Sequence, residues 1–314
     1  MVDRIVIRNV VSGVEQEISF DNSVFVLDSI DWDSPSISME SYRVPFQIGQ
    51  TLSGVTVGTR KPTVTGYVVA DMSKITALGK TWEEFFNEQE RQIEESKLVL
   101  DKLISVYQDV TIKTGEYSLS ARPTQPPKYS IERKENNEIM CLFTLEFECY
   151  DPLFYSESKV VDLASIIGEF HFPLIIPPEG VVFGKIMRRQ SMLIENAGDS
   201  NVGCIITITA VGGQVKDPSV YNVNTGKEIV LEGVTMNDGD TITINTNVGE
   251  ENVIHHVQLE SKDVSLIGYV KTGSDYIQIE QGSAYYAYDV DEQYENNIEV
   301  SISYTERYFN IRGM

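Results

Sequence analysis

Runs of alternating apolar and hydroxyl-bearing residues mark the carboxy-terminal half of the chain. Residues 205–209 read Ile-Ile-Thr-Ile-Thr, and residues 241–244 read Thr-Ile-Thr-Ile. A period of two places successive side chains on opposite faces, as in a β-sheet that buries one face. Between these runs, residues 224–226 and 237–240 are rich in Asn, Asp and Gly, which tolerate positive φ at hairpin turns. The pattern predicts a sheet sandwich.

The amino-terminal half also reads mainly as strands. Apolar runs broken by glycines predict strands at residues 5–7, 23–30, 55–57 and 64–70. A turn region that contains Pro35 and Pro45 separates the second run from the third. Further strands are predicted at residues 110–112, 116–121 and 140–150. Asp151-Pro152 ends the last of these, because proline lacks an amide donor and restricts the residue before it.

One long helix is predicted from about residue 81 to residue 108. Ile93 and Leu100 belong to a series of apolar residues that recurs every seven positions and so forms one face. Thr81 and Glu84 have the spacing of a capping box, in which two side chains satisfy free amides at a helix start. The polar Gln89 interrupts the apolar seam, which argues against a self-sufficient coiled coil. We expect the two ends of the helix to pack on a sheet of the same chain.

These elements predict a mainly β (α+β) protein with two domains. The length of 314 residues supports two domains, and the Asp-Pro break places them at 1–155 and 156–314. Residues 156–190 are irregular and contain several prolines, so we expect a segment laid across a surface rather than a central strand. The last strands are predicted at 275–280, 285–288 and 298–304.

Composition narrows the possible environments and partners. The chain has 25 basic and 47 acidic residues, a net charge of -22, which disfavours a grip on nucleic acid. Charged residues near the amino terminus argue against a secretion signal, and no apolar run is long enough to span a membrane. The three cysteines Cys141, Cys149 and Cys204 are predicted to be buried thiols of a reducing cytoplasm.

Candidate chemistry is sparse. The sequence contains no dinucleotide, zinc-protease or nucleophile-elbow motif. His171 lies between two phenylalanines, and the adjacent His255 and His256 would point to opposite faces of a strand. We therefore predict no catalytic residue, no metal site and no cofactor, although paired carboxylates of a glycosidase type are not excluded by counting.

A cluster of tyrosines near the carboxyl terminus is the one candidate binding feature. Tyr285, Tyr286 and Tyr288 lie close together in the sequence. Such a cluster can form a sugar-stacking platform or an interface patch, and it can equally pack in a core or across strands. The sequence leaves these alternatives open.

The order of several short motifs resembles that of one protein family, the distal tail proteins of long-tailed bacteriophages that infect Gram-positive bacteria. In the amino half, the segment 60–67 (Arg-Lys-Pro-Thr-Val-Thr-Gly-Tyr), the long helix and the exit 151–155 (Asp-Pro-Leu-Phe-Tyr) are similar to the family's ring-forming half. In the carboxy half, the resemblance to the family's galectin-like half rests on residues 172–174, 195–199, 217–218, 224–227 and 239–246.

This resemblance implies a structural virion protein. Members of the family form hexameric rings at the tail tip, between the tail tube and the tail-associated hub or lysin protein, and often hold receptor-binding or baseplate proteins. The chain would then be assembled in the bacterial cytoplasm and reside in the virion tail tip, with DNA passing as unbound cargo through an acidic bore. The alternative is a carbohydrate-binding module for host wall polysaccharide, with Tyr285, Tyr286 and Tyr288 as the stacking residues.

Overall fold

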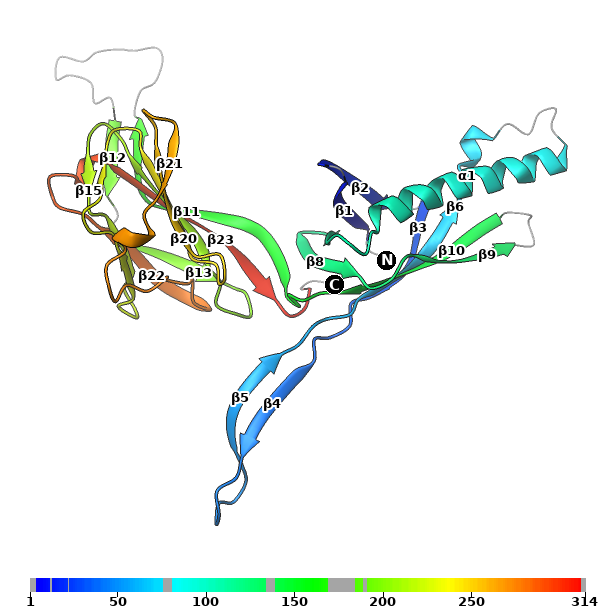
Figure 1. Ribbon diagram of the computed structural model, residues 1–314, viewed down its shortest axis with the longest axis horizontal. Coiled ribbons are helices and arrows are strands. Elements are labelled where there is room, and N and C mark those ends of the chain that lie inside the picture. Colours follow the sequence, from blue (N-terminus) through cyan, green and yellow to red (C-terminus); the bar gives the residue numbers. More distant parts are fainter. Residues whose placement is uncertain are drawn as a thin grey trace. The chain divides into compact units, whose positions relative to one another are not determined.

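The computed structural model describes residues 4–11, 13–21, 23–75, 81–133, 139–168, 184–188 and 191–311 (Figure 1). The chain divides into two compact units. Unit 1 contains the described residues up to Ser156 together with those from Phe309 onward, and unit 2 contains Glu157–Tyr308. Strands dominate both units, which confirms the predicted mainly β class.

Unit 1 is built from two groups of antiparallel strands. The first group has the order β2-β1-β7-β8, with β1 (Ile5–Val11), β2 (Val14–Phe20), β7 (Val110–Thr114) and β8 (Tyr117–Pro123). The second has the order β3-β6-β10-β9, with β3 (Phe25–Asp31), β6 (Thr63–Val69), β9 (Lys128–Arg133) and β10 (Ile139–Glu148). Pairing of β10 with β8 at Phe147 and Pro123 joins the groups. Alternate residues of β6 and β10 are buried, as a period of two requires.

The helix α1 (Trp82–Leu103) contacts β1, β2, β6 and β10. Its start is as predicted, because the Thr81 hydroxyl accepts a hydrogen bond from the Glu84 amide at 3.3 Å. The Glu84 carboxylate in turn accepts one from the Thr81 amide at 2.8 Å. The capping box therefore satisfies amides that have no partner within the helix. A short 3-10 turn, η1 (Met72–Lys74), precedes the helix in the chain.

The end of α1 differs from the predicted residue 108. The helix stops at Leu103, where the Asn9 side chain on β1 donates to the Leu103 carbonyl at 2.7 Å. Ile104 leaves the helical conformation with ψ of 70°. Tyr107, which continues the seven-residue series in the sequence, lies beyond the helix and is 89% exposed. A tertiary contact thus satisfies a terminal carbonyl and fixes the boundary.

Unit 2 contains two packed sheets. The first sheet has the strand order β11-β23-β14-β19-β20-β21, and β12 pairs with β11. The bounds of its strands are β11 (Phe154–Gly168), β12 (Gly184–Arg188), β14 (Cys204–Ala210), β19 (Thr241–Asn245), β20 (Asn252–Val257), β21 (Lys262–Ser265) and β23 (Ile298–Tyr308). The other has the order β13-β22-β16-β17, with β13 (Met192–Asn196), β16 (Ser219–Asn222), β17 (Glu228–Val230) and β22 (Gly282–Asp289). Smaller elements are β15 (Val215–Lys216), β18 (Thr235–Met236), η2 (Ile267–Tyr269) and η3 (Glu295–Asn297).

Two predictions for this half are wrong. Residues 154–168 form one continuous strand, β11, which pairs with β12, instead of a segment laid across a surface. The rest of that stretch, including His171, lies outside the described residues. Residues 275–280 are extended but form no ladder, because the Ile279 amide bonds to the Val202 carbonyl alone and the Glu280 amide bonds to the Tyr286 hydroxyl.

The core of unit 2 lies between its two sheets. Alternate residues of β14 and β19 enter it, and Ile206, Ile208, Ile242 and Ile244 are each at most 1% exposed. The three cysteines of the chain are buried and free, as predicted. Burial raises the pKa of the Cys204 thiol to about 11, so the thiol stays protonated and acts as a small apolar group.

Candidate functional site

A projecting hairpin is the most unusual surface of unit 1. Its strands are β4 (Ile37–Tyr42) and β5 (Thr51–Val57), and residues 37–57 are called the arm below. Within the described part of the chain, β4 and β5 pair with each other alone (Figure 1). Both outer edges of this ladder carry backbone groups that are available to another strand.

The two faces of the arm differ in chemistry. Ile37 pairs with Val57 and Met39 pairs with Val55, so these four side chains share one face near the base. The partners on the other face are Ser38 with Thr56 and Glu40 with Gly54. The arm is thus amphipathic, like a strand pair that covers a core.

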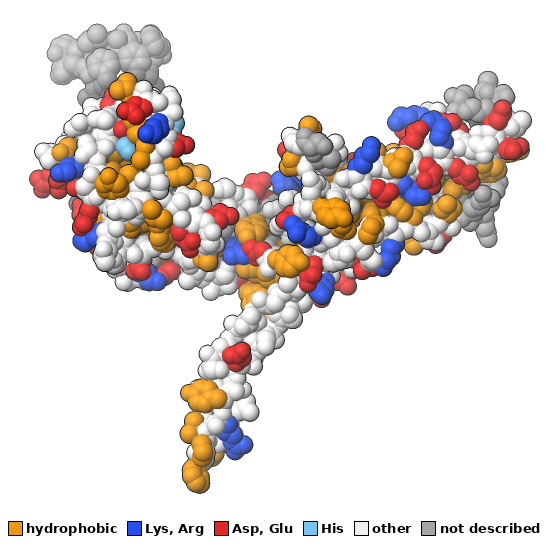
Figure 2. All heavy atoms as spheres, viewed as in Figure 1, with side chains coloured by type: hydrophobic (Ala, Val, Ile, Leu, Met, Phe, Trp, Pro, Cys, Tyr) orange, Lys and Arg blue, Asp and Glu red, His pale blue; other side chains and the backbone are white. Residues whose placement is uncertain are grey.

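Among the described residues, none covers the apolar face, whose side chains are exposed. Met39 is 68% exposed and Val55 is 53% exposed. At the tip, Phe46 and Ile48 are fully exposed, at 105% and 101%. Figure 2 shows hydrophobic side chains gathered toward the far end of the arm. A two-stranded hairpin with such a face is marginally stable alone in water, and an exposed apolar patch of this kind is typical of an interaction surface.

The base of the arm is held by a buried arginine. Arg60 follows β5 and is 1% exposed, the largest of the fully buried side chains. Its guanidinium donates to four backbone carbonyls, those of Pro152 (2.8 Å), Asp33 (3.1 Å), Trp32 (3.4 Å) and Phe309. It also lies 4.5 Å from the centre of the Phe154 ring. Burial lowers the pKa of this guanidinium, while Cys149 and Asp33 act in the opposite direction.

A second apolar surface lies at the start of α1. The rings of Trp82, Phe85 and Phe86 contact one another, with centroid separations of 6.0 to 6.3 Å. Trp82 is 73% exposed. The expectation that both helix ends pack on a sheet is therefore wrong at this end, where the rings pack on each other instead.

The three candidate tyrosines do not form one surface. Tyr286 is fully buried, and its hydroxyl donates to the Gln278 carbonyl at 3.0 Å and accepts from the Glu280 amide. Burial raises its pKa to about 12. Tyr288 is half-buried against the core of unit 2. Tyr285 alone is well exposed, at 46%, and it pairs across the strands with the exposed Leu193.

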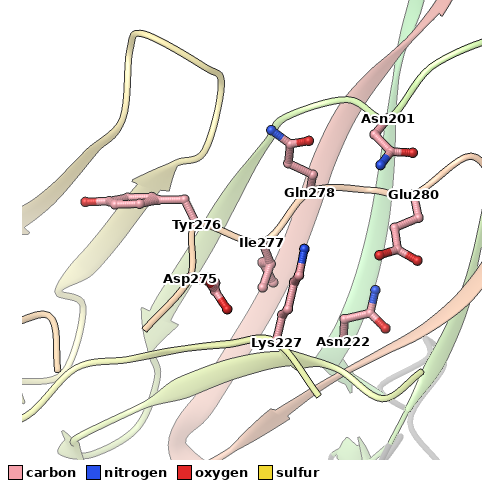
Figure 3. Close-up of a pocket in the computed structure, with 8 residues that line it drawn as sticks. All are labelled: Asn201, Asn222, Lys227, Asp275, Tyr276, Ile277, Gln278 and Glu280. Atoms are coloured by element: carbon pink, nitrogen blue, oxygen red, sulfur yellow. The ribbon is translucent and has the colours of Figure 1, made fainter. Parts of the chain in front are cut away.

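A polar cavity of about 250 Å³ lies in unit 2 beside the extended segment 275–280 (Figure 3). Seven of its eight lining residues are polar or amphipathic: Asn201, Asn222, Lys227, Asp275, Tyr276, Gln278 and Glu280, with Ile277 the eighth. Asn222 is held in place, because its side-chain oxygen accepts from the amides of Asn224 and Thr225. Mixed donors and acceptors of this kind suit a polyhydroxylated ligand better than an anion.

The remaining titratable groups serve the fold. His255 is buried and contacts the Asp240 carboxylate at 3.2 Å, whereas His256 is exposed beside Asp263. The two rings thus point to opposite faces, as predicted. Asp240 also accepts from the amides of Asn237 and Gln258, which closes the turn between β18 and β19. Within the described ranges, no three His, Cys, Asp or Glu residues are grouped as metal ligands.

Comparison with known proteins shows where unit 2 belongs. Residues 197–308 match the family model described as "Siphovirus-type tail component, C-terminal domain". The resemblance to phage distal tail proteins that the sequence predicted is confirmed. The curated proteins give no match.

Solved structures show a likeness in fold over the whole chain. The crystal structure of phage SPP1 Dit (gp 19.1), described as a paradigm of the hub adsorption apparatus in Gram-positive infecting phages, has a TM-score of 0.57. The match has 14% identity and covers 96% of this chain and 98% of that one, which establishes a shared fold. A chain of the phage P2 baseplate in its activated conformation with Ca has a TM-score of 0.46 and 10% identity, with coverage of 96% and 98%. No helix in the described part of the chain has the length and apolar character needed to cross a membrane.

The arm is the surface that sequence reasoning missed. The prediction placed a turn around Pro35 and Pro45 and a strand at 55–57, but it did not pair that strand with residues 37–42. A signal was present, because Ile37, Met39, Val55 and Val57 alternate with polar or small residues on both sides of a turn. The sequence pattern did not show that the apolar face would be exposed.

Proposed function

We propose that this chain is a structural hub protein at the distal end of a phage tail, where six copies form a ring. The ring joins the tail tube to the tail-associated hub or lysin protein and holds baseplate or receptor-binding proteins at its edge. The match of residues 197–308 to a siphovirus tail component and the Dit-like fold of the whole chain support this role. Its place is the virion tail tip, after assembly in the host cytoplasm.

The exposed apolar face of the arm is the observation that supports self-association. An arm that lies on a different surface of the next copy makes a head-to-tail contact, and such contacts close into a ring when the rotation between copies is right. A face that contains Met39 and Val55 would be covered in the ring, while the polar face with Ser38 and Thr56 stays open to water. The energy of assembly thus comes from burial that a single chain does not achieve.

The charge of the chain agrees with the same role. A net charge of -22 gives no counterion-release gain on contact with DNA. A ring with an acidic bore would let the genome pass without retaining it. No catalytic group is needed for this function, and we propose that the chain is not an enzyme.

Mass measurement of the full chain by sedimentation tests the proposal. We expect the wild type to form a ring of about six copies, and the double variant M39S/V55S to shift at least a hundredfold toward monomer. That factor corresponds to about 2.7 kcal/mol, which is in the range for uncovering two apolar side chains. The matched control S38A/T56A changes the polar face and should assemble as the wild type does.

One outcome would contradict the role of the arm, and another would contradict the ring itself. If M39S/V55S and S38A/T56A have the same mass distribution as the wild type, the apolar face does not mediate assembly. If the chain is a monomer at every concentration and binds wall polysaccharide in calorimetry, the carbohydrate-binding alternative is favoured. The polar cavity of Figure 3 is the place where such a ligand would fit best.

A further inference from the structure

Arg60 donates four hydrogen bonds to backbone carbonyls at the base of the arm. Its four hydrogen-bond acceptors are all carbonyls, and they come from three separate stretches of the chain. Trp32 and Asp33 lie on the segment that enters the arm, and Arg60 itself lies on the segment that leaves it. Pro152 and Phe309 belong to the body of unit 1. One side chain therefore ties both legs of the arm to the body.

The chemistry of the side chain suits this task. A guanidinium carries five N–H donors in a rigid planar fork, and here four carbonyls receive hydrogen bonds from it. Phe154 adds a cation–π contact on one face. Burying a cation is costly unless it is well hydrogen-bonded, so a site of this kind is specified closely. Lysine, with a compact ammonium and a flexible stem, does not reproduce the fork.

Other contacts next to the Arg60 side chain, called the clamp below, also restrict the segments that enter and leave the arm. Asp33 has a positive φ of 52°, and its carboxylate accepts from the Lys61 amide at 3.3 Å. The Gly58 amide donates to the Ser36 carbonyl at 2.7 Å, and a Cβ at Gly58 would lie 2.2 Å from the Ser36 hydroxyl. The base of the arm is thus closed by short-range contacts, and the side chain of Arg60 joins both the entering and the leaving segment to the body of unit 1.

We propose that Arg60 is a positioning residue that holds the arm in a fixed direction, so that a second copy of this chain meets a pre-oriented docking surface. The proposal rests on the proposed function, in which the arm docks on another copy. Ordering a mobile element on binding costs free energy, and an element that is already ordered avoids that cost. Loss of the clamp should therefore weaken assembly even though the apolar face of the arm is unchanged.

Fluorescence of Trp32 gives a direct readout of the arm base. The chain has two tryptophans, so W82F leaves Trp32 as the single reporter. Its ring stands edge-on to the Phe154 ring at 5.2 Å, next to the guanidinium. In the W82F reference, we compare R60K, which keeps the charge, with R60M, which removes it. R122K and R122M are the controls, since Arg122 forms an exposed ion pair with Asp109 elsewhere in unit 1.

We expect R60K and R60M to lower the anisotropy of Trp32 and to weaken association at least tenfold, with the Arg122 variants unchanged in both. If R60M does not fold, R60K carries the test, because it retains a cation of similar length. The proposal is overturned if R60K leaves Trp32 anisotropy and association as in the reference. The W82F reference separates this proposal from the proposed function. If the wild type and W82F are both monomeric, the proposed function is contradicted. The anisotropy of Trp32 then still shows whether Arg60 holds the base of the arm.

Discussion

The arm and the β14–β19 pair are built on the same pattern and have opposite environments. Both are antiparallel ladders in which apolar residues alternate with small or hydroxyl-bearing ones. In unit 2, Ile206 and Ile244 pair across the ladder and are at most 1% exposed. In the arm, Met39 and Val55 pair in the same way and are 68% and 53% exposed. Only the covering layer differs.

This difference teaches what a period of two does and does not determine. The period selects a strand and collects the apolar side chains on one face. In unit 2, the β13-β22-β16-β17 sheet of the same chain covers that face. In the described part of unit 1, no such layer covers the arm. The same local pattern therefore stabilises the monomer in one region and favours assembly in the other.

The largest expected effect comes from weakening the covered ladder. Replacement of Ile206 by alanine removes buried methyl and methylene groups and leaves a cavity, so I206A should lower the free energy of unfolding by about 2–5 kcal/mol. Urea denaturation of the full chain measures the loss. Ile206 lies in unit 2, so the substitution should lower the stability of that unit and leave the arm unchanged.

The neighbouring residue supplies the control for this prediction. Ile205 lies on the opposite face of β14 and is 37% exposed. I205A should therefore cost well under half of what I206A costs. Equal losses for I205A and I206A would mean that the two faces of β14 are covered to the same extent, and the contrast with the arm would then be lost.

The sequence predicted the elements that are determined by residues close together in the chain. It missed those that are determined by contacts between residues far apart in the chain. The start of α1 was predicted because Thr81 and Glu84 are three residues apart. Its end was placed too late, because the residue that satisfies the Leu103 carbonyl is Asn9, 94 positions away. For the same reason Tyr286 was grouped with Tyr285: adjacency in sequence does not show which face of β22 is buried.

The contacts of Arg60 at the base of the arm were beyond sequence reasoning for a related reason. The four carbonyls around Arg60 are backbone groups, and a backbone carbonyl leaves no mark in composition or motif. Arg60 itself was noted as part of the segment 60–67 that resembles the ring-forming half of the family. Its burial was not predictable, because a lone arginine between strands most often points to solvent.

A second expected effect concerns a buried carboxylate in unit 2. Glu306 is 2% exposed and accepts from Lys159 Nζ at 2.6 Å, the Tyr308 hydroxyl at 2.7 Å and the Ala197 amide at 2.8 Å. Burial alone would raise the pKa of this carboxyl, but the three donors outweigh burial and lower it from the ordinary 4.5. Its contribution to stability is therefore present above pH 4.5 and is lost as the pH falls through the lowered pKa of the folded state.

Denaturation at a series of pH values tests this assignment. E306Q should cost about 1–3 kcal/mol at pH 7, because it removes a charge-assisted acceptor from a buried site. Its stability should also fall less steeply than that of the wild type below pH 4.5. E40Q is the control, since Glu40 is exposed on the arm. A wild type and an E306Q variant with the same acid profile would show that folding does not lower the pKa of Glu306.

The smallest expected effect is at the start of α1, where side chains of nearby residues form hydrogen bonds with the free backbone amides. T81A removes the hydroxyl that accepts from the Glu84 amide, so it should lower the free energy of unfolding by about 1 kcal/mol. N87A, at an exposed position of the same helix, should instead raise it by up to about 0.5 kcal/mol, since alanine is the better helix former. Denaturation followed by helical circular dichroism measures both. If T81A leaves the free energy of unfolding unchanged or raises it, the capping box does not stabilise the helix start.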